Sequence, residues 1–261
     1  MRLDGYAGRR RLGLSDLRRF ESESLFDRSA RVVCGAQCVA KKELYENWAC
    51  AAAIHEHFFS RAMAPRVVVD VCGGHGLLGW FLLVMTSQTR CFAVDPRIPK
   101  SAATLRDAFG REWPGLGSRH RYLEARAEDL SLGPHALVVA LHACGGLTDD
   151  VLLAAVDGRA HAAVVPCCHS LRGYRLPVRV DRLDDIDRTR CAFMTDHGYD
   201  VVSHFLPAHL TPKNQVLFAA RPFSNGLSHD DDDDVGLPLR SPLREALGPA
   251  RLPSLAWSRW R

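Results

Sequence analysis

The chain has 261 residues, of which 47% are hydrophobic and 25% are charged. This length and composition suit one α/β domain with terminal segments, and they exclude a disulfide-stapled miniature scaffold, a disordered chain and a collagen-like repeat. The formal net charge of +4 permits contact with nucleic acid without requiring it. The nine cysteines are an odd number, which argues against a closed disulfide framework. We therefore expect a reducing compartment, the cytoplasm or the nucleus.

Residues 1–65 are predicted to form a helical and basic N-terminal segment. Its arginines stand at positions 9, 10, 11, 18 and 19, where they can neutralise phosphates. Apolar positions at helical spacing predict a helix over residues 43–63 that lies against the next domain. The longest apolar run, residues 76–85, is about half of the ~20 residues that a membrane helix needs. We therefore expect no membrane association.

From residue 66 onwards, apolar runs alternate with helical segments. Five such runs lie at residues 67–71, 91–95, 121–125, 136–141 and 162–166. Nearly continuous apolar strands that alternate with helices are typical of a parallel sheet covered on both faces. Two more runs, at 200–206 and 215–221, are too close for a crossover helix and predict an antiparallel hairpin. The predicted fold class is α/β, with a seven-stranded, mainly parallel sheet that ends in this hairpin.

The predicted domain spans residues 66–223. Beyond it, residues 224–261 contain five consecutive aspartates at 230–234 and several prolines. Such a composition is typical of a flexible, acidic tail.

A glycine-rich turn follows the first predicted strand and precedes an apolar helix, in the sequence DVCGGHGLLG from Asp70. Glycines at this place let a cofactor approach the backbone amides at a helix N-terminus. Gly74, Gly76 and Gly79 match the dinucleotide pattern GxGxxG, which would indicate an NAD(P)-dependent oxidoreductase. Asp70 followed by glycines also matches the loop of S-adenosylmethionine enzymes.

The acid that ends the second strand, Asp95, does not separate these two cofactors. A carboxylate can accept hydrogen bonds from both hydroxyls of a ribose, and both cofactors carry one. Because Pro96 follows it, Asp95 can also be read as a helix cap. The choice therefore depends on later motifs.

Three further motifs are more specific: KKELYE at 41–46, LHACGGLTDD at 141–150 and PCCHS at 166–170. Together they resemble a methyltransferase family that includes tRNA acceptor-stem 2′-O-methyltransferases, rRNA-adenine-dimethylase-like proteins and the glutathione S-transferase C-terminal-domain-containing proteins. The resemblance covers about residues 40–221. It implies the Rossmann-like fold of class I methyltransferases, S-adenosylmethionine as the cofactor, and RNA (tRNA or rRNA) as the substrate.

The resemblance implies a cofactor site at the glycine loop and the strand ends. Its residues are Asp70, Cys72, Gly73, Gly74, Gly76, Asp95, Pro96, Glu128, Asp129 and Leu141. Asp70 and the glycines are expected near the methionine end and Asp95 at the ribose, with Glu128 or Asp129 near the adenine. Cys72 stands where the first glycine of the loop is usual, as in the branch linked to glutathione transferases. The zinc-finger segments of the tRNA enzymes are missing, so their particular substrate does not carry over.

The expected catalytic residues are His142, Cys144, Lys42 and Glu46. Methyl transfer is an in-line displacement that depends mainly on the alignment of donor and acceptor. For a hydroxyl acceptor, His142 is the candidate base; for an amine, His142 or His169 would position it. Lys42 can hold a phosphate or the cofactor carboxylate, and Glu46 can accept a proton.

The same motifs carry further expectations. Cys144 and Gly145 would line the methyl-transfer site, and Thr148 and Asp149 would begin the next helix as its cap and first-turn acid.

Two alternatives concern metal and activity. Cys167, Cys168 and His169 could bind a metal together with Cys144 or His142, since thiolate and imidazole suit zinc. Adjacent cysteines point in different directions along an extended backbone and no CxxC pair occurs, so no metal is expected. A methyltransferase fold that has lost catalysis and serves as an interaction protein is the other alternative, because fold does not fix function.

Overall fold

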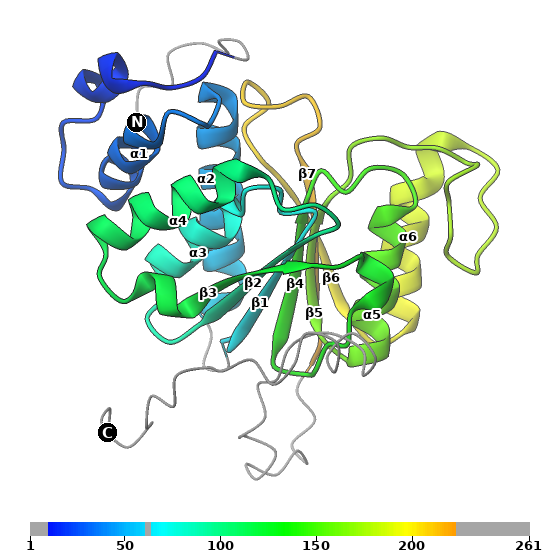
Figure 1. Ribbon diagram of the computed structural model, residues 1–261. Coiled ribbons are helices and arrows are strands. Elements are labelled where there is room, and N and C mark those ends of the chain that lie inside the picture. The colour runs from blue at the N-terminus through cyan, green and yellow to red at the C-terminus, as the bar shows by residue number, and fades with distance from the viewer. Residues whose placement is uncertain (1–9, 61–63, 223–261) are drawn as a thin grey trace, which may run out of the picture.

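The computed structural model describes residues 10–60 and 64–222, and the predicted acidic tail at 224–261 lies outside these ranges. Figure 1 shows a central sheet with α1 to α4 on one face and α5 and α6 on the other. The strands are β1 (Val67–Val71), β2 (Arg90–Asp95), β3 (His120–Glu124), β4 (Ala136–Leu141), β5 (His161–Val165), β6 (Asp200–Phe205) and β7 (Gln215–Ala220). The helices are α1 (Leu25–Ala36), α2 (Lys41–Ile54), α3 (Leu77–Met85), α4 (Lys100–Glu112), α5 (Leu147–Gly158) and α6 (Ile186–Asp196).

The sheet has seven strands in the order β3-β2-β1-β4-β5-β7-β6. The first five strands pair in parallel, and β7 pairs antiparallel with both β5 and β6. The predicted fold class is therefore confirmed, including the C-terminal hairpin. In the doubly wound dinucleotide fold the sixth strand lies directly beside the fifth. Here β7 lies between them, which separates this sheet from that fold.

Both faces of the central strands are buried, which explains why they consist almost entirely of apolar residues. Val67 and Val69 of β1 belong to the core under α5 and α6, whereas Val68 between them belongs to the core under α1 to α4. Side chains alternate between the two faces along a strand. A strand that is buried on both faces is expected to be apolar at every position, and the sequence VVVDV fits this except at Asp70. Asp70 lies next to the glycine loop and is described with the functional site below.

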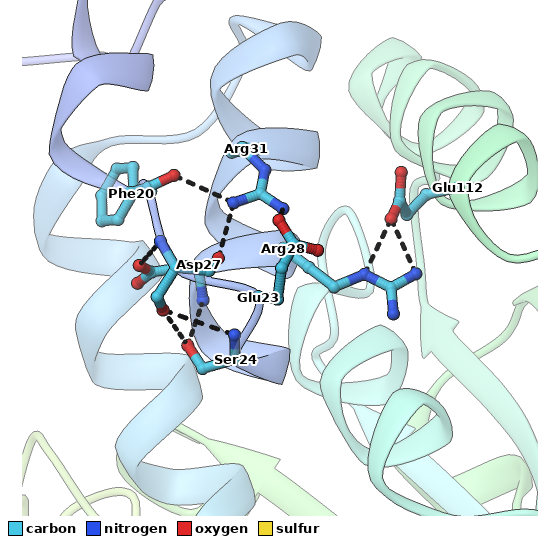
Figure 2. A network of polar contacts seen from close by, with 8 residues as sticks. Phe20, Glu23, Ser24, Asp27, Arg28, Arg31 and Glu112 are labelled. Atoms are coloured by element: carbon cyan, nitrogen blue, oxygen red, sulfur yellow. Dashed lines mark hydrogen bonds and ion pairs between the residues drawn. The ribbon is translucent and has the colours of Figure 1, made fainter.

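The N-terminal segment packs on the sheet side that carries α3 and α4. Ser24 caps α1 by accepting a hydrogen bond from the amide of Asp27, and Arg28 pairs with Glu112 at the end of α4 at 2.9 Å (Figure 2). Arg31 donates to the carbonyl of Phe20, which fixes the approach to α1 (Figure 2). The buried side chains of this segment share one core with α3 and α4.

The helix expected over 43–63 begins two residues earlier, as α2. The carboxylate of Glu43 accepts from the amide of Ala40, which caps the start of α2. Residues 55–59 continue as a π-helical turn. The predicted packing against the next domain is observed, because α2 contacts α3.

Two sequence expectations about the whole chain can be compared with this structure. Within residues 10–60 and 64–222, no helix combines the length and apolar character that crossing a bilayer demands. All nine cysteines are free thiols.

Candidate functional site

The site lies where the strand order reverses, between β1 and β4. In open α/β sheets, ligands bind at the carboxyl ends of the strands at such a reversal. Here the glycine loop, residues 72–76, follows β1, and the segment that begins with His142 follows β4. Cys72 and His142 each occupy the left-handed region, with φ of 58° and 65°. This conformation costs a residue with a side chain ~1–2 kcal/mol, and such strain gathers at functional sites.

The glycines of the loop differ in what a side chain at each position would contact. A Cβ at Gly73 would lie 2.9 Å from the carbonyl oxygen of Asp70, and one at Gly76 would lie 2.9 Å from the ring of Tyr122. Gly74, with φ of 51°, faces open space. Packing therefore requires Gly73 and Gly76, whereas Gly74 leaves room for a ligand to approach the backbone.

Asp70 is buried beneath the loop. Its carboxylate accepts a hydrogen bond from the amide of Gly79 at 3.2 Å, so it holds the first turn of α3 against β1. Burial raises the pKa of Asp70 from 3.8 to about 7, although the bond from Gly79 opposes the shift. The observed contact is with the protein's own backbone, and contact with the methionine end of a cofactor stays a prediction.

The raised pKa of Asp70 makes stability depend on pH. A carboxyl with a higher pKa in the folded chain makes folding less favourable as the pH rises from the unfolded to the folded value. We expect Asp70→Asn to remove this loss and to stabilise the protein by a few kcal/mol at about pH 8, with a smaller gain at about pH 5. Thermal unfolding at the two pH values measures this, with the exposed Asp107→Asn as control. The same stability gain at both pH values would contradict it.

Asp95 ends β2 opposite the glycine loop. One carboxylate oxygen accepts from the amide of Gly74 at 3.3 Å and the other from the amide of Arg97 at 3.1 Å. A carboxylate has about four acceptor positions, so two remain for ribose hydroxyls. The bond from Arg97 lies in the loop before α4, whose N-cap is Pro99, so the helix-cap reading of Asp95 is wrong. This bond leaves room for the predicted ribose contact.

A cavity of about 250 Å³ adjoins Asp95. Pro96, Ala125 and Asp129 are among the residues that line it. Of the two acids left open for the adenine, Asp129 lines this cavity, whereas Glu128 is exposed and pairs with Arg126 at the surface. With the open face of Gly74 and the carboxylate of Asp95, these residues fit an adenosyl cofactor.

Three of the four predicted catalytic side chains meet at the carboxyl end of β4. The carboxylate of Glu46, on α2, lies 2.8 Å from Nε2 of His142 and 3.5 Å from Nζ of Lys42. Glu46 is 3% exposed, and the hydroxyl of Thr211, in the β6–β7 loop, also contacts it. Burial raises the pKa of Glu46, but the contacts with His142, Thr211 and Lys42 outweigh it, and this pKa lies below its ordinary value. The Glu46 carboxylate is therefore ionised.

Two further site candidates are placed differently. Leu141, the last residue of β4, is half-buried and packs against the core under α2 and α3. Cys144 is exposed and lies with Cys167 and Cys168, 2.8 Å from the Cys167 sulfur.

A buried ion pair anchors the segments after β4 and β5, and no sequence motif marks its cation, Arg190. Arg190, on α6, donates to the carboxylate of Asp149 at 2.7 Å, to that of Asp187 at 2.9 Å, and to the carbonyl of Gly145. Asp187 also contacts Nε2 of His169 at 2.7 Å. His169 therefore contacts α6. Arg190 connects the LHACGGLTDD segment after β4 with the PCCHS segment after β5.

The predicted cap of α5 is wrong. Gly146 occupies the cap position, and Thr148 lies inside the first turn, where its hydroxyl donates to the carbonyl of Ala143. A tight turn at Gly145, with φ of 61°, ends the loop early, so the helix begins before Thr148. Asp149 does lie in the first turn, as expected.

Removal of Arg190 should cost much stability. Arg190→Met leaves the Asp149 carboxylate buried without its main partner, and such losses typically cost about 3–5 kcal/mol. Arg188→Met is the matched control, because Arg188 lies on the same helix and its side chain is 81% exposed. Chemical denaturation measures both. Equal unfolding free energies for the two variants would show that the buried pair contributes nothing.

Comparisons with known proteins agree with the observed sheet. A family model described as "Methyltransferase domain" matches residues 41–172, about half of the chain. No curated protein sequence matches the chain.

Among solved structures, magnesium protoporphyrin IX methyltransferase from Synechocystis PCC 6803, with bound S-adenosylhomocysteine, is 13% identical. That match covers 80% of this chain and 99% of the other, with a TM-score of 0.50. A Corynebacterium glutamicum protein is 14% identical over 82% of this chain and 98% of its own, with a TM-score of 0.49. The methyltransferase SibL is 17% identical over 79% of this chain, with a TM-score of 0.47, and this chain spans only 65% of its length. At these identities, the likeness to the Synechocystis protein shows a shared fold.

Proposed function

The chain belongs to the methyltransferase-domain family, and from this premise we propose that it transfers a methyl group from S-adenosylmethionine to a hydroxyl group of RNA. When bound, the cofactor supplies an electrophilic methyl group on a sulfonium sulfur. Asp95 would hold the ribose, the open backbone at Gly74 would lie against the cofactor, and Asp129 would line the adenine side. These residues belong to the glycine loop, the end of β2 and the lining of the cavity beside Asp95.

The contact between Glu46 and His142 is the observation that carries the proposal. An ionised carboxylate only accepts hydrogen bonds, so Nε2 of His142 must carry the proton between them. The other ring nitrogen, Nδ1, is then free to accept a proton. A buried carboxylate behind an imidazole fixes its tautomer and stabilises the imidazolium that forms. This arrangement suits the removal of a proton from a hydroxyl, whereas an amine acceptor needs no such base.

Cations of the N-terminal segment and of α2 support RNA as the substrate class. Arg11 forms a β-bridge with Ala40, directly before α2, and Lys42 lies one turn ahead of Glu46 on that helix. Arg10 and Arg19 pair with Asp16, while Arg11 and Arg18 have no ion pair within the described residues and are exposed. Basic side chains on an exposed segment that precedes α2 can neutralise phosphates and orient the RNA.

The first experiment is calorimetric titration of the full chain with S-adenosylhomocysteine, with NADH in parallel. Binding of S-adenosylhomocysteine alone is expected. A screen with S-adenosylmethionine that carries a radiolabelled methyl group would then compare total RNA, protein and small metabolites as acceptors. Label in RNA is expected; label confined to protein or metabolites overturns the substrate class. Binding of NADH alone would favour an oxidoreductase, and binding of neither ligand by folded protein would favour an interaction protein.

A further inference from the structure

Three thiols from two loops gather beyond the carboxyl ends of β4 and β5. Cys144 follows β4, and Cys167 and Cys168 follow β5. The sulfur of Cys144 lies 2.8 Å from that of Cys167 and 3.4 Å from that of Cys168, and the last two sulfurs are 3.7 Å apart. All three ligand atoms therefore lie within 4.8 Å of one another.

The expectation that adjacent cysteines diverge does not hold here. It assumed an extended backbone, on which neighbouring side chains point to opposite faces. Strand β5 ends at Val165, before both cysteines, so they do not lie in a regular strand. Their sulfurs are only 3.7 Å apart, so the argument against a metal loses its geometric basis.

Hydrogen bonds at Gly145 hold the two loops together. The amide of Gly145 donates to the carbonyl of Cys168 at 2.8 Å, and the carbonyl of Gly145 accepts from Arg190 at 3.0 Å. Cys167 is buried, whereas Cys144 and Cys168 are exposed. The three sulfurs thus form a fixed group that is closed on the protein side and open towards solvent.

We propose that Cys144, Cys167 and Cys168 bind one zinc ion through their three thiolates, with a fourth coordination position open towards solvent. Zinc–sulfur bonds are about 2.3 Å long, which places tetrahedral thiolates about 3.8 Å from one another. The observed separations of 2.8 to 3.7 Å need only a small outward movement to reach this geometry. A disulfide would join two sulfurs at about 2.05 Å and leave the third unused. The convergence of three sulfurs therefore favours a single thiophilic ion.

This site shares no residue with the Glu46–His142 dyad or with the lining of the cavity beside Asp95, so it goes beyond the proposed methyl transfer. Zinc would join the segments after β4 and β5, the two segments that Arg190 also connects. The fourth position would be available to water or to a ligand from solvent.

The test uses the full chain, reduced with a phosphine and stripped of metal with a chelator. Zinc is titrated against a colorimetric chelator, and cobalt(II) is used as a spectroscopic substitute. We expect one zinc per chain and the ultraviolet charge-transfer band of cobalt–thiolate bonds. Absence of zinc binding by the reduced protein, or cobalt binding without that band, would overturn the proposal.

Variants locate the ion. Cys144→Ser and Cys168→Ser change exposed residues, so both variants should fold. Each should lower the zinc affinity by more than ~10–100-fold, the loss typical when a residue that only supports a ligand is changed. Cys38→Ser and Cys191→Ser lie outside the group and should bind zinc as the unchanged protein does. Equal affinity in all four variants would place any bound zinc elsewhere. Titration with S-adenosylhomocysteine reports separately on the proposed function, so the two ideas can fail independently.

Discussion

Replacement of Asp95 by alanine should lower the affinity for S-adenosylhomocysteine by at least about 100-fold. Hydrogen bonds to a charged group contribute about 1.5–3 kcal/mol each, and the Asp95 carboxylate has two acceptor positions left for the ribose hydroxyls. The same carboxylate holds the amide of Gly74, so its loss also releases the loop that borders the cofactor. Calorimetry of the metal-free protein measures the affinity.

Two further variants separate these contributions. Asp95→Asn keeps an oxygen that can accept from Gly74 but removes the charge, so its affinity should lie between those of the alanine variant and the unchanged protein. Asp107→Ala removes an exposed carboxylate on α4 and should bind the ligand normally. Retained affinity in Asp95→Ala would mean that another group binds the ribose.

The second large effect concerns catalysis. His142→Asn should lower kcat for an identified hydroxyl acceptor by about 10²–10⁴-fold, the usual contribution of a positioned base, without changing the affinity for S-adenosylhomocysteine. Asparagine is chosen because it tolerates the left-handed backbone of His142 and can still donate to Glu46, but it cannot take up the proton. Steady-state methyl transfer gives kcat and KM separately.

Glu46→Gln tests the other half of the dyad. It leaves the imidazole without its carboxylate, and kcat should fall although His142 is intact. His204→Asn, on the exposed strand β6, is the matched control and should have normal kcat. Normal turnover in His142→Asn would remove the base from the proposed mechanism.

The strands could be predicted from the sequence because each central strand is buried on both faces. This requirement produces uninterrupted apolar runs such as Val67–Val71, and the predicted strand ends differ from the observed ones by at most one residue. The hairpin was predictable for a simple reason of length, since the connection before Gln215 is too short for a crossover. Local pattern was sufficient in both cases.

The contacts within the site could not be predicted in the same way. Glu46 and His142 are separated by 96 positions, and Asp149 and Arg190 by 41, so no periodic pattern relates the partners. The resemblance indicated Glu46, His142 and Asp149 but not their partners. Nothing in the sequence distinguishes Arg190 from an arginine on the surface. These pairings depend on how helices from opposite ends of the chain pack around the carboxyl ends of the strands.

The central pair of strands sets the order in which the chain can fold. Val67 pairs with Ala136, and strands β2 and β3 and helices α3 and α4 are translated between the two halves of that pairing. During synthesis, β1 therefore has an open hydrogen-bonding edge until β4 emerges. Non-local pairing of this kind folds slowly because a long loop must close first. A chain that stops after β3 would present an apolar strand edge to its neighbours, and we expect such a fragment to aggregate rather than fold.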